Sequence, residues 1–270
     1  MDTALAKISF AVIGDSAAYG VGDAFEDQSP RGWAWFVANN LQAPCHYSNY
    51  SRPGAKSDEV REIQLQRALQ EQPNICAVIV GGNDLLRNGF SPERLYTNLK
   101  AITEQLLDRG SEVIMVELHD PGLILKIPEL LKRVLRRRVN AANSVYHRIA
   151  AEFNIVLIRT RKIPNVHDKA NWHVDRMHPG PIGHQLLANE ICRNLGARGW
   201  PAQSVEIQGG VQSSQIDRWL WMLRKGTPWF LKRSVDLLPV ALFLMAREAL
   251  SILFSSVLGA PQNQDVMNTY

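Results

Sequence analysis

Short apolar runs alternate with segments of helical pattern along residues 8–195, and this alternation limits the folds that the chain can adopt. The run at 76–80 is continuously apolar and stops at Gly81, which is typical of a strand buried on both faces of a parallel sheet. Parallel strands need long crossover connections, and the intervening helical segments supply them. The pattern therefore predicts an α/β fold: a three-layer α/β/α sandwich around a five-stranded parallel sheet.

The predicted elements follow one another in strict alternation. Strands are expected at residues 8–13, 46–50, 76–80, 112–118 and 155–158. Helices are expected at residues 31–41, 57–70, from 92 onward, 128–153 and 181–195. Ser57 and Ser91 are expected to be N-caps, because a serine hydroxyl can accept a hydrogen bond from a free backbone N–H of the first turn.

The composition changes near residue 209, which predicts a core domain over 1–200 and a C-terminal helical extension over 209–270. The longest charge-free pieces of this extension, 237–246 and 249–261, are shorter than the ~20 residues that span a bilayer. The segment 214–258 is amphipathic and rich in tryptophan. Two interpretations stay open: a helical element that packs on the core or forms a homodimer, and a peripheral membrane contact.

Charge and cysteine content exclude several classes of protein. A net charge of +4 is only mildly basic and does not indicate a nucleic-acid-binding protein. The three cysteines are widely spaced and form no C-x-x-C pair, so neither a disulfide framework nor a zinc knuckle is expected. The first residues lack the pattern of a secretory signal, which favours a cytoplasmic location.

Polar residues and glycines follow the first three predicted strands and precede the last helix. These segments are 14–16, 51–54, 81–84 and 175–180. In doubly wound sheets, ligands bind outside the carboxyl ends of the strands, so these segments are expected to meet around one site.

Together these segments contain the groups that acyl transfer requires. Ser16 supplies a hydroxyl nucleophile, His178 a general base, and Asp175 a carboxylate that orients the base. The side chain of Asn83 and the backbone N–H groups of Gly54 and Ser16 can stabilise an oxyanion. Each residue alone has a simpler interpretation, since a serine after a strand is more often a helix N-cap than a nucleophile.

The four segments resemble the sequence blocks of the SGNH hydrolases, the GDSL-like esterase and lipase superfamily. The matching motifs are Gly14-Asp15-Ser16 with Gly20 downstream, Gly54, Gly81-x-Asn83-Asp84, and Asp175-x-x-His178. The resemblance covers roughly residues 7–196, and it departs from the family name at Ala17, where GDSL has leucine.

This resemblance implies a flavodoxin-like fold and hydrolysis of carboxylic esters or thioesters without a metal or another cofactor. It also implies a catalytic triad of Ser16, Asp175 and His178, with an oxyanion hole formed by Ser16, Gly54 and Asn83. The expected substrate is a small-molecule or lipid-like ester. Whether water or an alcohol accepts the acyl group is left open, so an acyltransferase remains an alternative.

Two further alternatives come from other functional classes. Four histidines lie within a short stretch with two aspartates, which is a possible donor set for a zinc-dependent hydrolase. These residues are His167, Asp168, His173, Asp175, His178 and His184. This hypothesis leaves Ser16, Gly54 and Asn83 without a role. The last alternative is a non-catalytic binding module that docks through its C-terminal helices.

Overall fold

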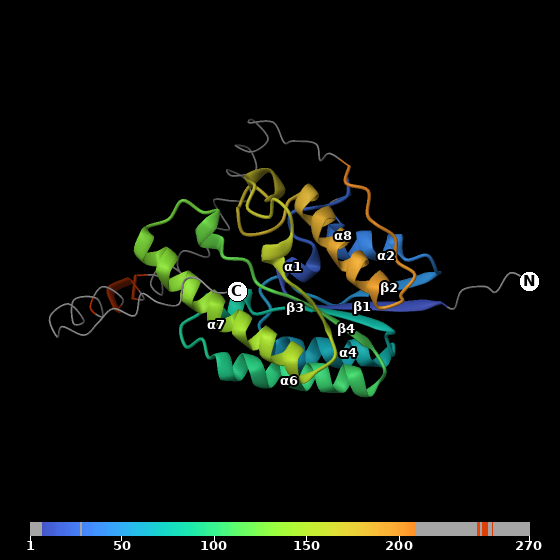
Figure 1. Cartoon of the computed structure of the whole chain (residues 1–270). Coiled ribbons are helices and arrows are strands. Elements are labelled where there is room, and N and C mark those ends of the chain that lie inside the picture. Colours follow the sequence, from blue (N-terminus) through green and yellow to red (C-terminus); the bar gives the residue numbers. More distant parts are fainter. Residues whose placement is uncertain (1–6, 28, 209–241, 244, 248–249, 251–270) are drawn as a thin grey trace, which may run out of the picture.

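The computed structural model describes residues 7–27, 29–208, 242–243, 245–247 and 250. In this part of the chain a parallel sheet lies between two layers of helices (Figure 1). Its strands are β1 (Ile8–Gly14), β2 (Cys45–Asn49), β3 (Ile75–Ile79), β4 (Glu112–Val116) and β5 (Val156–Ile158). The strand order β2-β1-β3-β4-β5, with every neighbouring pair parallel, is that of flavodoxin-like folds. The predicted α/β architecture is confirmed.

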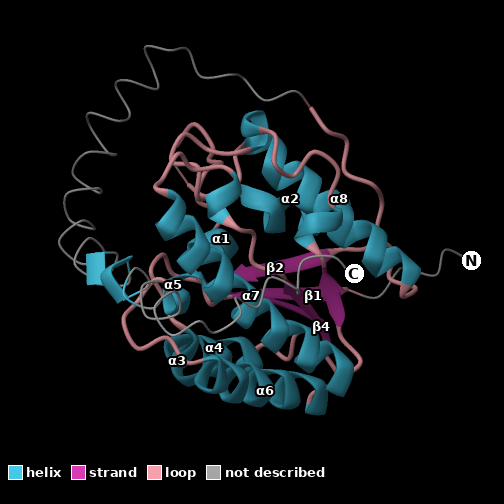
Figure 2. Ribbon diagram, turned by 60° about the vertical axis from the view of Figure 1, so that its left-hand side comes forward, coloured by secondary structure: helices cyan, strands magenta, loops and turns pink. Residues whose placement is uncertain are grey.

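The helices cover the two faces of the sheet (Figure 2). One layer contains α1 (Ser16–Tyr19), α2 (Gly32–Asn40) and α8 (Pro181–Ala197), and the other contains α3 (Ser57–Glu59), α4 (Leu65–Gln70), α6 (Pro92–Asp108) and α7 (Glu129–Glu152). The short α5 (Gly82–Leu85) follows β3. A π-helical turn, η1 (Val60–Gln64), joins α3 to α4, and three 3₁₀ turns are η2 (Pro121–Leu123), η3 (Thr160–Lys162) and η4 (Lys169–Asn171).

Both faces of the central strands are buried, which explains their continuous apolar sequence. In β1, Phe10 and Val12 belong to the core on the side of α2 and α8, whereas Ala11 and Ile13 belong to the core on the side of α4 and α6. Successive side chains of a strand point to opposite faces, so each core receives alternate residues. Trp33 of α2 is fully buried and donates from Nε1 to the carbonyl of Ala17, 2.9 Å away.

The N-cap predictions were partly wrong. Ser91 does cap α6, because its Oγ accepts a hydrogen bond from the backbone N–H of Arg94. Ser57 is instead the first residue of α3, and its hydroxyl donates to Asp84 Oδ1 at 2.6 Å. The hydroxyl that the local sequence pattern assigned to helix capping therefore bonds to the carboxylate of Asp84, 27 residues further along the chain. Ser16 is likewise not the cap of α1, since Asp15 fills that position.

The fourth strand ends earlier than its sequence suggests. The predicted strand ran to residue 118, but β4 ends at Val116. The backbone N–H and carbonyl of Leu118 pair with the side-chain amide of Asn143 on α7, both at 2.9 Å. The backbone N–H of Glu117 still donates to the carbonyl of Ile158 on β5 at 3.0 Å, whereas the Asn143 amide takes the place of a neighbouring strand at Leu118, so the chain leaves the sheet there.

The carboxyl end of β1 is held by a second side-chain amide. Gln64, at the end of the π turn, accepts from the backbone N–H of Gly14 at 2.7 Å and donates to its carbonyl at 3.0 Å. Gln64 is buried, so these two bonds satisfy backbone groups that water does not reach. The π turn brings both Gln64 and the apolar Leu65 into the interior at adjacent positions.

Most of the predicted C-terminal extension, and therefore the predicted division at 209, lies outside the described residues. Of the few residues described there, Leu242, Phe243 and Leu250 are exposed to solvent. No helix in the described part of the chain has the length and apolar character needed to cross a bilayer.

Replacing Gln64 by Leu tests the role of the buried amide. We expect Gln64→Leu to lower the free energy of unfolding by about 2–4 kcal/mol, because two buried backbone groups of Gly14 lose their side-chain partner. Urea denaturation measures this value. Gln66→Leu, at an exposed position of α4, is the matched control and should change stability by less than about 0.5 kcal/mol. Equal effects of both substitutions would contradict the assigned role.

Candidate active site

Ser16 lies where β1 turns sharply into α1. Gly14 has φ +146°, and a Cβ atom at this position would lie 2.0 Å from the carbonyl oxygen of Ile79 on β3. Glycine therefore allows the ends of β1 and β3 to approach closely. Asp15 then caps α1 by accepting from the backbone N–H of Ala17 at 3.0 Å, and Ser16 becomes the first residue of the helix.

The loop before α8 brings His178 to this serine, although 162 residues separate them in sequence. Ser16 Oγ lies 2.8 Å from His178 Nε2, and His178 Nδ1 lies 2.8 Å from Asp175 Oδ2. The other carboxylate oxygen of Asp175 accepts from the backbone N–H groups of Met177 and His178, at 2.9 and 3.1 Å. Arg176 adopts a positive φ of 58° inside this tight turn. The three predicted triad residues thus form one continuous hydrogen-bonded chain.

The environment of Asp175 keeps it ionised. Burial alone would raise its pKa, but hydrogen bonds and charge interactions with His173 and His178 outweigh burial and hold the pKa far below its usual range. His173 Nδ1 lies 3.1 Å from the same oxygen, Oδ2, that His178 contacts. A permanent carboxylate at this point fixes the His178 ring and stabilises positive charge on it.

The predicted oxyanion donors face the same cavity as the triad. Ser16, Gly54, Asn83 and His178 all line a cavity of about 340 Å³, which we call the main cavity. One hydrogen of the Asn83 side-chain NH₂ group is donated to the carbonyl of Ala55 at 3.1 Å, which leaves the second for a ligand. This bond also joins α5 to the loop that carries Gly54. Gly54 has a positive φ of 87°, a conformation that favours glycine.

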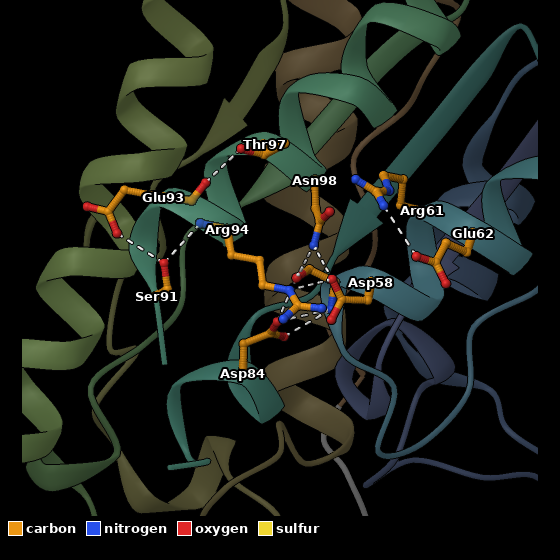
Figure 3. Close-up of polar contacts among 10 residues, drawn as sticks. Asp58, Arg61, Glu62, Asp84, Ser91, Glu93, Arg94, Thr97 and Asn98 are labelled. Carbon is orange, nitrogen blue, oxygen red and sulfur yellow. Dashed lines mark hydrogen bonds and ion pairs between the residues drawn. The ribbon is translucent and has the colours of Figure 1, made fainter. Parts of the chain in front are cut away.

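A buried polar network anchors the helix that carries Asn83. The next residue, Asp84, accepts hydrogen bonds from the backbone N–H and the hydroxyl of Ser57. Asn98 of α6 donates to the Ser57 hydroxyl and to Asp58, each at 2.9 Å. Figure 3 shows Asn98 and Arg94 both directed toward Asp58, with Asp84 beside them. These contacts tie α3, α5 and α6 together behind the site.

The walls of the main cavity are mostly apolar. They include Leu85, Leu86, Leu118, Pro121 and Val139. The segment that follows β3 forms part of these walls, and Arg138 of α7 holds it in place. Arg138 Nη1 donates to the carbonyls of Leu85 at 2.6 Å and Arg87 at 2.8 Å. A polar reaction centre at the edge of an apolar hollow can receive the acyl chain of an ester.

Of the histidines considered as metal ligands, His173 and His178 contact Asp175, whereas His184 bonds to the backbone elsewhere. His184 is fully buried, with Nδ1 accepting from the backbone N–H of Trp33 and Nε2 3.0 Å from the carbonyl of Val21. Burial lowers the pKa of His184 to about 4, so this ring is a neutral structural link. Among the residues described, no three His, Cys, Asp or Glu side chains gather as a metal site requires.

Sequence reasoning missed Glu117 and His119, which lie beside the site at the carboxyl end of β4. His119 lines the main cavity, and both residues line a smaller neighbouring cavity. Their position after a strand is the kind of place where ligands bind in such sheets, but the strand sequence does not show where β4 ends. The predicted strand ran to residue 118 and included Glu117 and Leu118, so these residues were not expected in a loop beside the site.

The model of the GDSL-like Lipase/Acylhydrolase family matches residues 12–186. A comparison with curated protein sequences found no match.

Several solved structures share the fold. TesA is 22% identical with a TM-score of 0.56, and the alignment covers 70% of this chain and 98% of TesA. A mutant of Axe2, an acetyl-xylooligosaccharide esterase from Geobacillus stearothermophilus, is 19% identical with a TM-score of 0.58, covering 70% and 94%. A lipase/acylhydrolase from Enterococcus faecalis is 20% identical with a TM-score of 0.54, and the alignment covers 73% of this chain and 100% of that protein.

These structural likenesses, at low sequence identity, establish the fold alone. The family match extends further, because it includes more than half of the chain. Its range contains the turn after β1, the segments after β2 and β3, and the loop before α8, which were the four motifs singled out in the sequence. The predicted family is therefore confirmed: the chain belongs to the GDSL-like lipase/acylhydrolase family, the SGNH hydrolases.

Proposed function

We propose that this protein hydrolyses carboxylic esters or thioesters through an acyl-enzyme formed on Ser16. The observation that carries the proposal is the chain of hydrogen bonds from Ser16 through His178 to Asp175 at the edge of the main cavity. This chain links a nucleophile, a general base and an orienting carboxylate in the order that acyl transfer needs.

In the first step, Ser16 Oγ attacks the ester carbonyl carbon while its proton passes to His178 Nε2. The electron pair of the C=O bond moves onto the carbonyl oxygen, which becomes an oxyanion. His178 gains a positive charge, and Asp175 stabilises it through Nδ1. The short Oγ to Nε2 distance of 2.8 Å is within the range for direct proton transfer.

The oxyanion lies among three donors: the backbone N–H groups of Ser16 and Gly54 and the side-chain NH₂ group of Asn83. Such preorganised donors stabilise the charge that develops in the transition state, usually by several kcal/mol in total. Two contacts keep Asn83 in place before substrate binds: its own bond to the Ala55 carbonyl, and the bond between Ser57 and the adjacent Asp84.

The tetrahedral intermediate then collapses. His178 gives its proton to the leaving alcohol oxygen or thiol sulfur, and the acyl group stays on Ser16. A water molecule, deprotonated by His178, attacks this acyl-enzyme, and a second collapse releases the acid and restores the Ser16 hydroxyl. An alcohol in place of water would give the acyltransferase reaction.

The main cavity supports esters of small to medium acyl chains. Its volume of about 340 Å³ and its apolar walls suit a hydrocarbon chain rather than a charged group. Exposed Leu123, Leu242, Phe243 and Leu250 are compatible with a lipid-like substrate or a peripheral membrane contact. The predicted membrane or dimer contact through 214–258 and the predicted cytoplasmic location stay predictions.

Asp15 adds a pH-dependent element next to the nucleophile. It is only 4% exposed, and burial raises its pKa to about 6, against the opposing effect of backbone hydrogen bonds from Ala17 and Gly82 and the charge of His178. An acid whose pKa is raised by folding binds its proton more tightly in the folded protein. Its contribution to stability is therefore complete below about pH 4 and is lost as the pH rises through about 6.

Removing the nucleophile tests the proposal directly. Ser16→Ala should lower kcat for p-nitrophenyl butanoate by about 10⁴-fold or more, because no other group can form the acyl-enzyme. The matched control is Ser144→Ala, at an exposed position of α7 where the hydroxyl bonds only within the helix. Hydrolysis by Ser16→Ala at the rate of this control would overturn the proposal.

Asn83→Ala tests the oxyanion hole. We expect kcat to fall by about 10²–10³-fold with KM little changed, because the lost hydrogen bond acts in the transition state. Asn39→Ala removes an amide that bonds within α2 and serves as the control. A higher KM with unchanged kcat would show that Asn83 only binds substrate.

Asp15→Asn tests the buried carboxyl. Asparagine can keep the cap of α1 but carries no charge, so the variant should gain stability relative to the parent as the pH rises from 4 to 7. The pKa change from 3.8 to about 6 corresponds to a gain of about 3 kcal/mol. Urea unfolding at several pH values measures it, with the exposed Asp108→Asn as control. A pH-independent difference between Asp15→Asn and the parent would contradict this role.

A further inference from the structure

A second cavity of about 90 Å³ lies beside the main cavity, between the carboxyl ends of β4 and β5 and the start of α8; we call it the side cavity. Most of its lining is apolar, but three of its residues are polar and unsatisfied. Glu117 Oε2, His119 Nε2 and Thr160 Oγ1 are buried and have no hydrogen-bond partner among the residues that the structure describes.

The residues that carry these three atoms all line one small cavity, and a polar ligand there would give the atoms partners. A buried polar atom without a partner costs about 1–3 kcal/mol, and proteins rarely keep one without a use. One water needs about 10–15 Å³ of this kind of volume, so the side cavity has room for several polar atoms. The cavity therefore suits a group that hydrogen-bonds to all three residues.

The three side chains define the chemistry of that group. The Glu117 side chain is 2% exposed and uses its Oε1 to contact His147 Nε2 on α7, which leaves Oε2 as an acceptor. The Thr160 hydroxyl can both donate and accept. The His119 ring packs against Trp172 with the ring centroids 4.0 Å apart and the planes tilted by 40°, and burial, with repulsion from His178 and His167, lowers the pKa of His119 to about 3. A neutral imidazole also offers a donor or an acceptor, so the set is complementary to hydroxyl groups.

The position of the side cavity indicates which half of an ester it meets. Both cavities share Ala17, Ile79, Leu118, His119 and Met177 as lining residues. The oxyanion donors and His178 line the main cavity, and the two neighbours of His178 in sequence, Met177 and Pro179, line the side cavity, so His178 lies at the boundary between the two. His178 must protonate the leaving oxygen, so the alcohol half of the substrate lies on the His178 side.

We propose that Glu117, His119 and Thr160 form a subsite for hydroxyl groups on the alcohol half of the substrate, so that the enzyme prefers esters of polyols such as glycerol or a sugar. This inference rests on the proposed hydrolase function. A substrate hydroxyl donates to Glu117 Oε2 and accepts from Thr160 or His119. An alcohol half with no hydroxyl beyond its ester oxygen leaves these three side chains without hydrogen-bond partners, and that difference gives the selectivity.

The test compares two esters with the same acyl group and a three-carbon alcohol: 1-monobutanoylglycerol and propyl butanoate. Acid release gives kcat/KM for each, and the ratio measures recognition of the two extra hydroxyls. Thr160→Val keeps the shape and removes the hydroxyl, so the ratio should fall about threefold to tenfold. Glu117→Gln removes the charge, and the ratio should fall about tenfold or more. Thr160→Ser should retain the parent ratio.

The control is Thr97→Val, the same chemical change on α6, where the hydroxyl donates to the carbonyl of Glu93. A ratio that stays at the parent value in Thr160→Val and Glu117→Gln overturns the proposal. A third ester, propyl 3-hydroxybutanoate, carries its hydroxyl on the acyl half. If the two substitutions change kcat/KM for this ester alone, the proposal is also overturned. Thr160→Val should not lower the melting temperature, and a clear drop would show that the hydroxyl has a structural partner instead.

Failure of the subsite and failure of the hydrolase proposal are distinguishable. If the subsite is wrong, propyl butanoate is still hydrolysed and Ser16→Ala still abolishes the reaction. If neither ester nor p-nitrophenyl butanoate is hydrolysed in a Ser16-dependent way, the proposed function itself is refuted, and the subsite proposal falls with it.

Discussion

The close contact between the ends of β1 and β3 fixes where the nucleophile lies relative to the segment after β3. Gly14 permits it, because any side chain there would collide with the Ile79 carbonyl. The backbone of Gly14 is then held by Gln64, and Asp15 bonds through its N–H to the same Ile79 carbonyl at 2.9 Å. Ser16 consequently begins α1 within reach of the segment that carries Asn83. Ser16 and Asn83 lie on separate short helices, and the paired ends of β1 and β3 set the relation between them.

The parallel sheet turns distant segments into neighbours, and side chains behind the site fix their orientation. Asp84, Ser57 and Asn98 anchor α5 from the side of α3 and α6, and Asn143 ends β4 from the side of α7. The carboxyl edge of the sheet therefore borders two cavities that differ in polarity. The main cavity is apolar around a polar reaction centre, whereas the side cavity is small and bears unsatisfied polar atoms.

The core elements could be predicted from the sequence, and so could Ser16, Asp175 and His178 as candidates that the structure brings together, because both depend on short-range signals. Apolar runs specify the strands, and glycine, asparagine and histidine motifs mark the loops that follow them. Glu117 and His119 were not found, because an amide from α7 ends β4 and the strand sequence shows no sign of it. Ser57 was misassigned as a cap for the same kind of reason: its hydroxyl bonds to a carboxylate 27 residues away.

The sequence alone determined the α/β class, the approximate limits of the strands and the identity of the residues that could carry acyl transfer. These features follow from the local hydrophobic pattern and from residue type, and both can be read from short stretches of the sequence. The tertiary structure decided the 2.8 Å distances that connect Ser16, His178 and Asp175, the raised pKa of Asp15, and the existence of the side cavity. Each of these three features depends on burial and on contacts between segments far apart in the chain, and none of them is encoded in any short stretch of sequence.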